Sequence, residues 1–247
     1  MPAPSLQQRL AARQRPAGAA VMRQGWERLL FLHWQIDPER IQATLPPGLT
    51  VDTHAGAAWL GVVPFFMRRV RPCFLPPVPW LSWFLELNLR TYVFDRDGNP
   101  GVWFYSLDCN QPVAVELARR FFHLPYQHAR MRAQIAADDR VDYHWQRRGA
   151  APGRFTYAPE GRAAPAEPDS LEFFLCERYL LFAADSGGGL HVGRVHHPPY
   201  QLQPASVANF DLQPISLAGF AVPNTPAGSV LYSARVEVEI FPLRRSR

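Results

Sequence analysis

The stretch Phe84-Leu85-Glu86-Leu87-Asn88-Leu89-Arg90-Thr91-Tyr92 shows a clear alternation of apolar and polar side chains. Successive side chains of a β-strand point to opposite faces, so this alternation predicts a strand. Its three leucines share one face, and Glu86, Asn88, Arg90 and Tyr92 share the other. The polar face either meets solvent or lines the inside of a closed sheet, and the alternation alone is compatible with both.

A second strand follows this one after a short turn. The turn Asp-Arg-Asp-Gly-Asn at residues 95–99 predicts a hairpin, with the partner strand over residues 102–109. Ser106 and Asp108 alternate along that strand, and we expect them to join the polar face of the first strand. Asp108 beside Arg90 would then form a partly buried ion pair, which is costly unless order or function requires it.

Candidate site residues follow if the polar face lines a cavity. Glu86 is the acid/base candidate, because a positioned carboxyl group can exchange a proton with a ligand. Arginine binds carboxylates and phosphates through two parallel hydrogen bonds. The ligand-binding candidates are Arg90, Asn88, Ser106 and Asp108 on the two strands, with Arg178 or Arg119 as a second clamp. For Arg119 and Arg178 the competing interpretation is a surface arginine that covers apolar neighbours.

Frequent turns predict many short elements in the rest of the chain. The sequence holds 25 prolines and 16 glycines, and its 47% hydrophobic content is typical of a packed globular protein. Short helices are expected after Asp37, from Pro112 and after Asp169. Further strands are expected at residues 24–35, 50–54, 57–71, 126–135, 141–148, 154–157, 179–184, 190–196 and 230–241. This pattern predicts a mostly β, α+β fold, closed or half-closed into an antiparallel barrel.

The two ends of the chain differ in composition. Residues 1–22 are rich in Ala, Arg, Gln and Pro, and we expect a loosely ordered N-terminal extension. This segment lacks the apolar core of a secretion signal, and an amphipathic transit peptide is the alternative. Residues 23–247 are expected to form a single domain, and no apolar run has the length of a membrane helix. The regular strand at residues 230–241 could pair across a dimer edge, so a homo-oligomer is possible.

Several kinds of chemistry and partner are excluded by residue usage. All 26 basic residues are arginine, so no lysine amine is present to form a Schiff base. The formal net charge is +5, but the arginines are scattered and no nucleic-acid-binding motif accompanies them, so we expect no nucleic-acid partner. The histidines lack metal-ligand spacing, and no phosphate-binding or dinucleotide-binding glycine motif occurs, so we expect no metal and no cofactor.

The three cysteines are odd in number and widely spaced, which indicates a reducing, cytoplasmic environment. Cys109, next to Asp108, is either a nucleophile or a small buried side chain. The adjacent pair His196-His197 would point its rings to opposite faces of a strand, so the two cannot easily share a metal ion.

A resemblance extends from about residue 23 to about residue 205. It is carried by Gly25-Trp26 through His33-Trp34, Leu45-Pro46-Pro47-Gly48-Leu49, Ala58-Trp59-Leu60-Gly61-Val62-Val63-Pro64-Phe65, Glu86 through Val93, Gly101-Val102 to Ser106-Leu107-Asp108, Ala118-Arg119, Leu124-Pro125-Tyr126, Glu177-Arg178-Tyr179 and His196-His197-Pro198. These blocks resemble the uncharacterised YqjF-like bacterial family, a domain of unknown function. The family is related in fold to acetoacetate decarboxylase, which implies a β-barrel or double-sheet cone with a central cavity.

The resemblance indicates that the polar face of the strand at residues 84–92 points inward, and it leads to two hypotheses. In the first, the cavity binds a small polar or anionic oxo or carboxylate metabolite, as a binding protein or as a lyase or proton-transfer enzyme. Acetoacetate decarboxylase attacks its substrate with a lysine, and the absence of lysine here excludes that activity. In the second, the chain is a non-catalytic structural or interaction protein on an inherited enzyme fold, with the loop Cys73 to Trp83 as a partner surface or lid.

Overall fold

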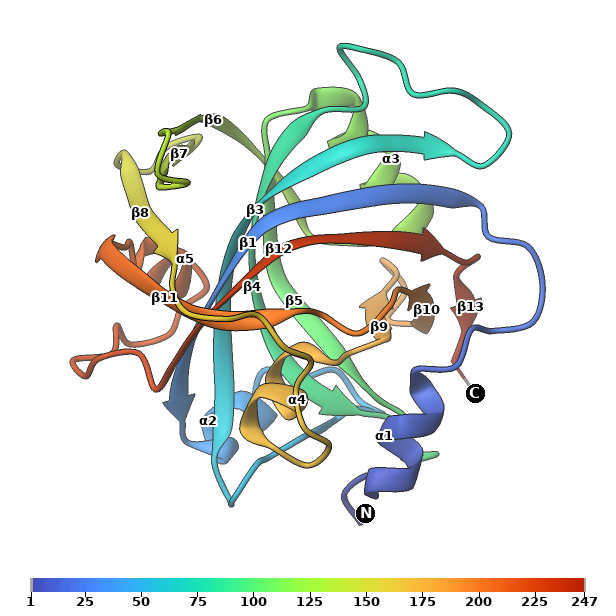
Figure 1. Ribbon diagram of the computed structural model, residues 1–247. Coiled ribbons are helices and arrows are strands. Elements are labelled where there is room, and N and C mark those ends of the chain that lie inside the picture. The colour runs from blue at the N-terminus through green and yellow to red at the C-terminus, as the bar shows by residue number, and fades with distance from the viewer. Residues whose placement is uncertain (1, 247) are drawn as a thin grey trace.

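The computed structural model describes residues 2–246 and is dominated by strands (Figure 1). Its helices are short, and its strands include three long ones at residues 22–36, 58–72 and 229–240. The elements are α1 (Leu6–Ala12), β1 (Met22–Ile36), α2 (Pro38–Gln42), β2 (Thr50–Val51), β3 (Ala58–Pro72), β4 (Phe84–Phe94), β5 (Pro100–Cys109), α3 (Pro112–Phe122), β6 (Tyr126–Ile135), β7 (Val141–Arg147), β8 (Gly153–Pro159), α4 (Leu171–Cys176), β9 (Leu180–Ala184), β10 (Leu190–His196), β11 (Leu202–Asn209), α5 (Gln213–Leu217), β12 (Ser229–Ile240) and β13 (Arg244–Arg245).

Strand pairing closes the sheet into two rings that share one wall. In the first ring, hydrogen-bonded neighbours follow the order β5–β9–β10–β12–β1–β3–β4 and return to β5. In the second ring, the order is β5–β6–β7–β8–β11–β12–β1–β3–β4, which also returns to β5. The shared wall is therefore β12–β1–β3–β4–β5, and Figure 1 shows its long curved strands β3, β1 and β12 side by side. Most pairs are antiparallel, while β5 runs parallel to β6 and β9.

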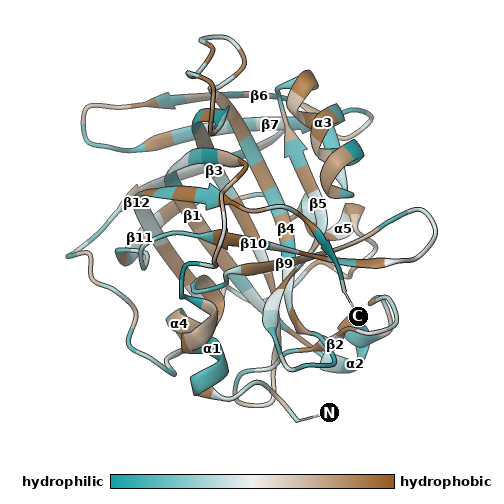
Figure 2. Ribbon diagram, turned by 90° about the vertical axis from the view of Figure 1, so that its right-hand side faces the viewer, coloured by the Kyte–Doolittle hydropathy of each residue, from teal (hydrophilic) through white to brown (hydrophobic). Residues whose placement is uncertain are grey.

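Both faces of the shared wall are buried, because each faces one ring. The three leucines of β4 pack with the aromatic side chains of β7 and β8, including Tyr143 and Phe155. Glu86, Asn88 and Arg90 point the other way, and their exposed fractions are only 3%, 5% and 8%. The alternating apolar and polar bands along β4 are visible in Figure 2. The polar face predicted for this strand therefore lies inside the molecule, and the solvent-facing alternative is wrong.

The mostly β fold class with a few short helices is confirmed. The predicted hairpins β4–β5 and β6–β7 are present. Ser170 caps α4 as expected from the capping signal near Asp169. The sequence patterns did not reveal α1, α5 or strand β11, since none of these has a strong periodic pattern, and β2 is shorter than expected.

The N-terminal segment contains ordered structure where a loosely ordered extension was expected. Helix α1 begins with a capping box between Ser5 and Gln8. On the same helix, Arg9 donates two hydrogen bonds to the carboxylate of Asp52, at 2.7 and 2.8 Å. Residues 6–12 are therefore anchored on the domain by an ion pair. None of the helices within residues 2–246 is both long and apolar enough to cross a membrane.

Candidate functional site

A cavity of about 310 Å³ lies inside the first ring, and side chains from the shared wall line it. Glu86, Asn88 and Arg90 of β4 all face it. Its mouth is formed by the loop between β3 and β4 (at the top of Figure 1) and by helix α3. Leu75 of this loop and Leu117 of α3 both line the cavity and are about half exposed, at 48% and 47%. Because β4 begins directly after the loop, the three polar residues lie at increasing depth from the mouth.

Glu86 is a buried carboxyl group with a single side-chain partner. The hydroxyl group of Tyr126 donates to Oε2 of Glu86 at 2.8 Å. Burial raises the pKa of Glu86 to about 8, although the Tyr126 hydrogen bond acts in the opposite direction. Glu86 is therefore mostly protonated at neutral pH, and it can donate a proton to a ligand or accept one near its pKa.

Arg90 is a buried cation for which residues 2–246 offer no anionic partner. Its Nη2 donates to the carbonyl oxygen of Leu175 at 3.0 Å, and its guanidinium group lies 5.5 Å from the ring centre of Phe31 and 5.7 Å from that of Tyr92. Its Nε has no hydrogen-bond partner, and within residues 2–246 no carboxylate forms an ion pair with it. Oδ1 of Asn88 is also buried without a partner. An anionic group in the cavity would satisfy donors that the protein leaves unused.

Ser106 and Asp108 lie on the opposite face of the wall, so the expected shared polar face is wrong for both. They are opposite Leu89 and Leu87 in the β4–β5 register and therefore point into the second ring. A bulge opposite Arg90 skips Tyr105 and changes the alternation along β5. Asp108 pairs with Arg147, not with Arg90, through hydrogen bonds of 2.7 and 2.9 Å.

Arg178 and Arg119 also lie outside the cavity lining. Nη1 of Arg178 donates to Asp52 at 2.7 Å, and its Nε donates to the Phe174 carbonyl at 2.7 Å. Arg119 lies on the exposed side of α3, where its Nε donates to the carbonyl of Tyr126 at 2.8 Å. Arg119 thus holds the residue that contacts Glu86, and neither arginine is placed to clamp a ligand with Arg90.

The remaining reactive side chains near the cavity are neutral and buried. Burial raises the pKa of the Cys109 thiol, which favours the interpretation of a buried, protonated side chain. Nε2 of His33 lies 2.7 Å from the Tyr92 hydroxyl, and burial keeps the pKa of this histidine well below its usual value. Burial lowers the pKa of His197 to about 4. Across the described residues 2–246, no group of three or more metal-ligating side chains is present.

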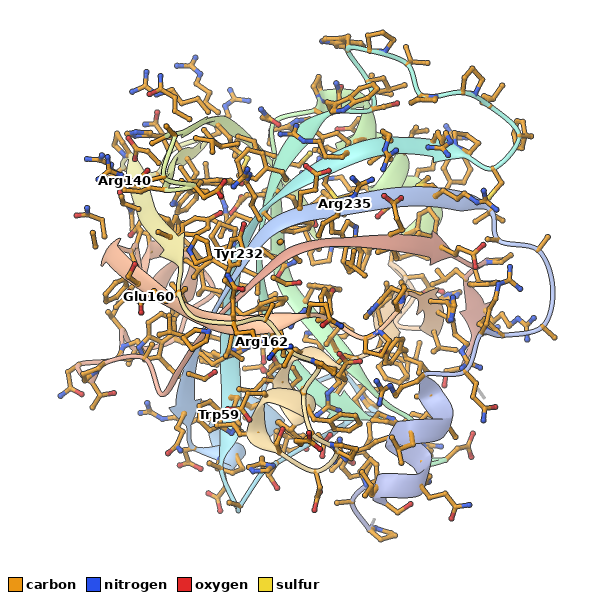
Figure 3. All side chains as sticks on the ribbon, viewed as in Figure 1. Trp59, Arg140, Glu160, Arg162, Tyr232 and Arg235 are labelled. Carbon is orange, nitrogen blue, oxygen red and sulfur yellow. The ribbon has the colours of Figure 1, made fainter. Side chains whose placement is uncertain are left out.

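Sequence reasoning missed the partners that give these charges their roles. Tyr126 beside Glu86, Asp52 beside Arg178 and Arg147 beside Asp108 each come from an element distant in the chain. No local pattern marks such a pairing. Figure 3 labels three exposed arginines, Arg140, Arg162 and Arg235, whereas Arg90 is buried, and the sequence alone does not show this difference.

The family DUF2071, described as an uncharacterized conserved protein, matches residues 23–237. This chain belongs to the DUF2071 family. A relative, the uncharacterized protein YqjF of Bacillus subtilis (strain 168), is 37% identical over 233 residues, which cover 93% of this chain and 94% of YqjF. The resemblance to the YqjF-like family is confirmed.

Solved structures with the same architecture confirm the acetoacetate decarboxylase-like fold of this DUF2071 protein. An acetoacetate decarboxylase from Legionella pneumophila is similar with a TM-score of 0.64 and 12% identity, over 96% of this chain and 94% of that chain. The enduracididine biosynthesis enzyme MppR, complexed with pyruvate, has a TM-score of 0.63 and 13% identity, over 94% of this chain and 93% of that chain. At such identities the likeness extends to the fold and to nothing finer.

Proposed function

We propose that this DUF2071 protein binds a small carboxylate- or oxo-bearing metabolite in its cavity, with Arg90 as the anchor. The observation that carries the proposal is a buried guanidinium group that faces a cavity and has no anionic partner among residues 2–246. Leaving a charge unpaired in a protein interior is costly, and a bound carboxylate would offset that cost. The solved structure of MppR, a protein of the same fold, is a complex with pyruvate, a small oxo acid.

Glu86 and Asn88 complete the proposed site. Asn88 has an unused acceptor between the two ionisable residues, and it would orient a donor group of the ligand. Glu86 would hold a proton near a ligand carbonyl, with Tyr126 fixing its orientation. If a reaction occurs, proton transfer beside a carbonyl is the class that these groups support, because the chain has no lysine for a Schiff base.

The test is mass spectrometry of small molecules that co-purify with the native protein, together with calorimetric titration of pyruvate and related acids. The Arg90→Gln variant should lose the anionic ligand, and the Glu86→Gln variant should keep binding but lose any proton exchange at the ligand. The matched control is Arg140→Gln, which removes an exposed arginine that does not line the cavity and should bind like the native protein. Equal binding by the Arg90→Gln variant would falsify the proposed anchor.

The alternative is a non-catalytic interaction protein on an enzyme fold, and one observation favours it. Phe74 and Trp80, on the loop between β3 and β4, are 83% and 68% exposed, which is unusual for large apolar side chains. This loop would then serve a partner protein. A native protein that binds no acid at millimolar concentration, and that carries none from the cell, would favour this alternative.

A further inference from the structure

The cavity has a much larger apolar surface than a small metabolite can cover. Its polar side chains are those of Glu86, Asn88 and Arg90 on β4, the tyrosines Tyr126 and Tyr200, and Gln24, Arg71 and Ser82. Most of the remaining lining is aliphatic or aromatic and comes from strands of the whole first ring, including Leu29, Val63, Phe65, Phe104, Leu107 and Val195. An acid of three or four carbons would satisfy Arg90 and leave most of this wall without a contact.

The apolar part of the wall reaches the surface at the mouth. Leu75, Val78 and Leu117 line the cavity and are also 48%, 49% and 47% exposed, so they mark the place where the cavity meets solvent. The segment from Cys73 to Trp83 contains no charged residue at all. A ligand that reached from Arg90 to the mouth would therefore meet apolar side chains along most of its length.

The distance from the anchor to the mouth sets the scale of the ligand. Arg90 is six residues from Phe84, where β4 begins after the loop, and a strand rises by about 3.3 Å per residue, or about 20 Å over six residues. A volume of about 310 Å³ is within the range that proteins use for drug-sized ligands. Both quantities exceed what pyruvate or acetoacetate would fill.

We infer that the ligand is an amphipathic carboxylic acid, with its carboxylate on Arg90 and an apolar chain or ring system that extends past Asn88 and Glu86 toward the loop and α3. This inference rests on the proposed function for the anionic end and adds the apolar end. The ligand class is then medium-length or aromatic monocarboxylic acids, with a polar substituent near Glu86 permitted.

The test is calorimetric titration of the full chain with straight-chain monocarboxylic acids of two to twelve carbons at pH 7. Each buried methylene group should tighten binding about three- to fourfold, until the chain reaches the mouth, where the gain stops. The heat-capacity change of binding should become more negative with chain length, because apolar surface leaves water.

Two variants test whether the apolar end of the ligand contacts the mouth of the cavity. Leu117→Gln places an amide on the mouth wall and should weaken only the longer acids, by about three- to tenfold, with no change for butyrate. The matched control is Val113→Gln, on the same helix and 38% exposed, which does not line the cavity and should change nothing. Both sites are partly exposed, so both variants should fold.

The outcomes distinguish this inference from the function on which it rests. Affinity that is Arg90-dependent but independent of chain length would overturn the apolar end and leave the proposed anion site standing. Affinity that rises with chain length but is equal in the native protein and in the Arg90→Gln variant would leave the apolar wall standing and remove the anchor. Failure of every acid to bind would overturn both.

Discussion

Two buried arginines, Arg90 and Arg178, have similar surroundings but opposite electrostatic situations. Both are less than 10% exposed, at 8% and 7%. Both donate a hydrogen bond to a carbonyl of helix α4, Leu175 for Arg90 and Phe174 for Arg178. Both guanidinium groups also lie close to the ring of Tyr92, at 5.7 Å and 5.1 Å from its centre.

The difference between them is the counter-ion. Arg178 pairs with Asp52, which also accepts two hydrogen bonds from Arg9. Burial alone would raise the pKa of Asp52, but the two guanidinium groups outweigh burial and hold it below its usual value. Arg90 faces the cavity and has no such partner within residues 2–246. A buried charge that the protein itself neutralises is structural, whereas one left for the cavity indicates a ligand site.

Removing the paired arginine should give the largest effect on stability. The Arg178→Leu variant leaves Asp52 buried with only Arg9 beside it, and we expect the free energy of unfolding to fall by about 3–5 kcal/mol. Urea denaturation at pH 7 measures this change. A loss under about 1 kcal/mol would show that Arg9 alone neutralises Asp52, and would weaken the contrast between the two arginines.

Glu86, the carboxyl group that faces the cavity, is buried without a cation beside it among residues 2–246, so its contribution to stability should depend on pH. The folded chain keeps the Glu86 proton up to about pH 8, while the unfolded chain releases it near 4.5. Between these values the unfolded state binds fewer protons, so the contribution of Glu86 to stability falls as pH rises. From pH 5.5 to 7.5 the Glu86→Gln variant should gain about 3 kcal/mol relative to the native protein, at about 1.4 kcal/mol per pH unit.

Parallel urea titrations of both proteins across this range provide the measurement. Glutamine keeps an acceptor for the Tyr126 hydroxyl, so the substitution isolates the charge. Two curves that stay parallel from pH 5.5 to 7.5 would mean that Glu86 titrates at an ordinary pKa and is ionised in the cavity, where it would repel an anionic ligand.

Removing Arg9, the second partner of Asp52, should lower the free energy of unfolding by an intermediate amount. The Arg9→Ala variant removes the ion pair that anchors α1, but Asp52 keeps Arg178. We expect a loss of about 1–2 kcal/mol in unfolding free energy, and faster hydrogen exchange in residues 6–12 than in the native protein. The matched control is Arg15→Ala, an arginine of the same region whose ion pair with Glu239 is exposed to solvent, and this variant should lose clearly less stability than Arg9→Ala. An equal cost in both variants would contradict the importance assigned to burial of Asp52.

Removing the unpaired arginine should have the smallest effect on stability. The Arg90→Gln variant leaves no carboxylate without its partner, so its unfolding free energy without ligand should stay within about 1 kcal/mol of the native value. Thermal unfolding with and without the acid ligand measures this, and the ligand should stabilise only the native protein. A loss comparable with that of Arg178→Leu would indicate a structural role for Arg90 and end its assignment to the ligand.

The inward position of the polar face of β4 was predictable only in part. Alternation along β4 put Glu86, Asn88 and Arg90 on one face, because successive side chains of a strand must alternate. The choice between inside and outside came from the resemblance, since a hydrophobic pattern with period two is the same for a half-exposed sheet and for a wall between two rings. The rings close through pairings such as β10 with β12, distant in sequence from β4.

The misplaced pair on β5 has one physical origin. Ser106 and Asp108 were expected beside Arg90 because each strand was read with uninterrupted alternation, but the bulge at Tyr105 shifts the register by one residue. A shift of one residue exchanges the faces of every side chain beyond it. Asp108 then meets Arg147 from β7 in place of Arg90.

Residue types and their order were enough to predict the strand-rich fold class, the family, the chemistry excluded by the absence of lysine, and which polar residues of β4 share a face. These properties depend on residue identity and on the local geometry of a strand. The three-dimensional packing was needed to show which arginine has a counter-ion, which carboxyl group is held protonated by burial, and where the apolar wall reaches the surface. Each of these depends on distances between segments far apart in the chain, because the strength of a charge interaction is set by its neighbours and its exclusion from water.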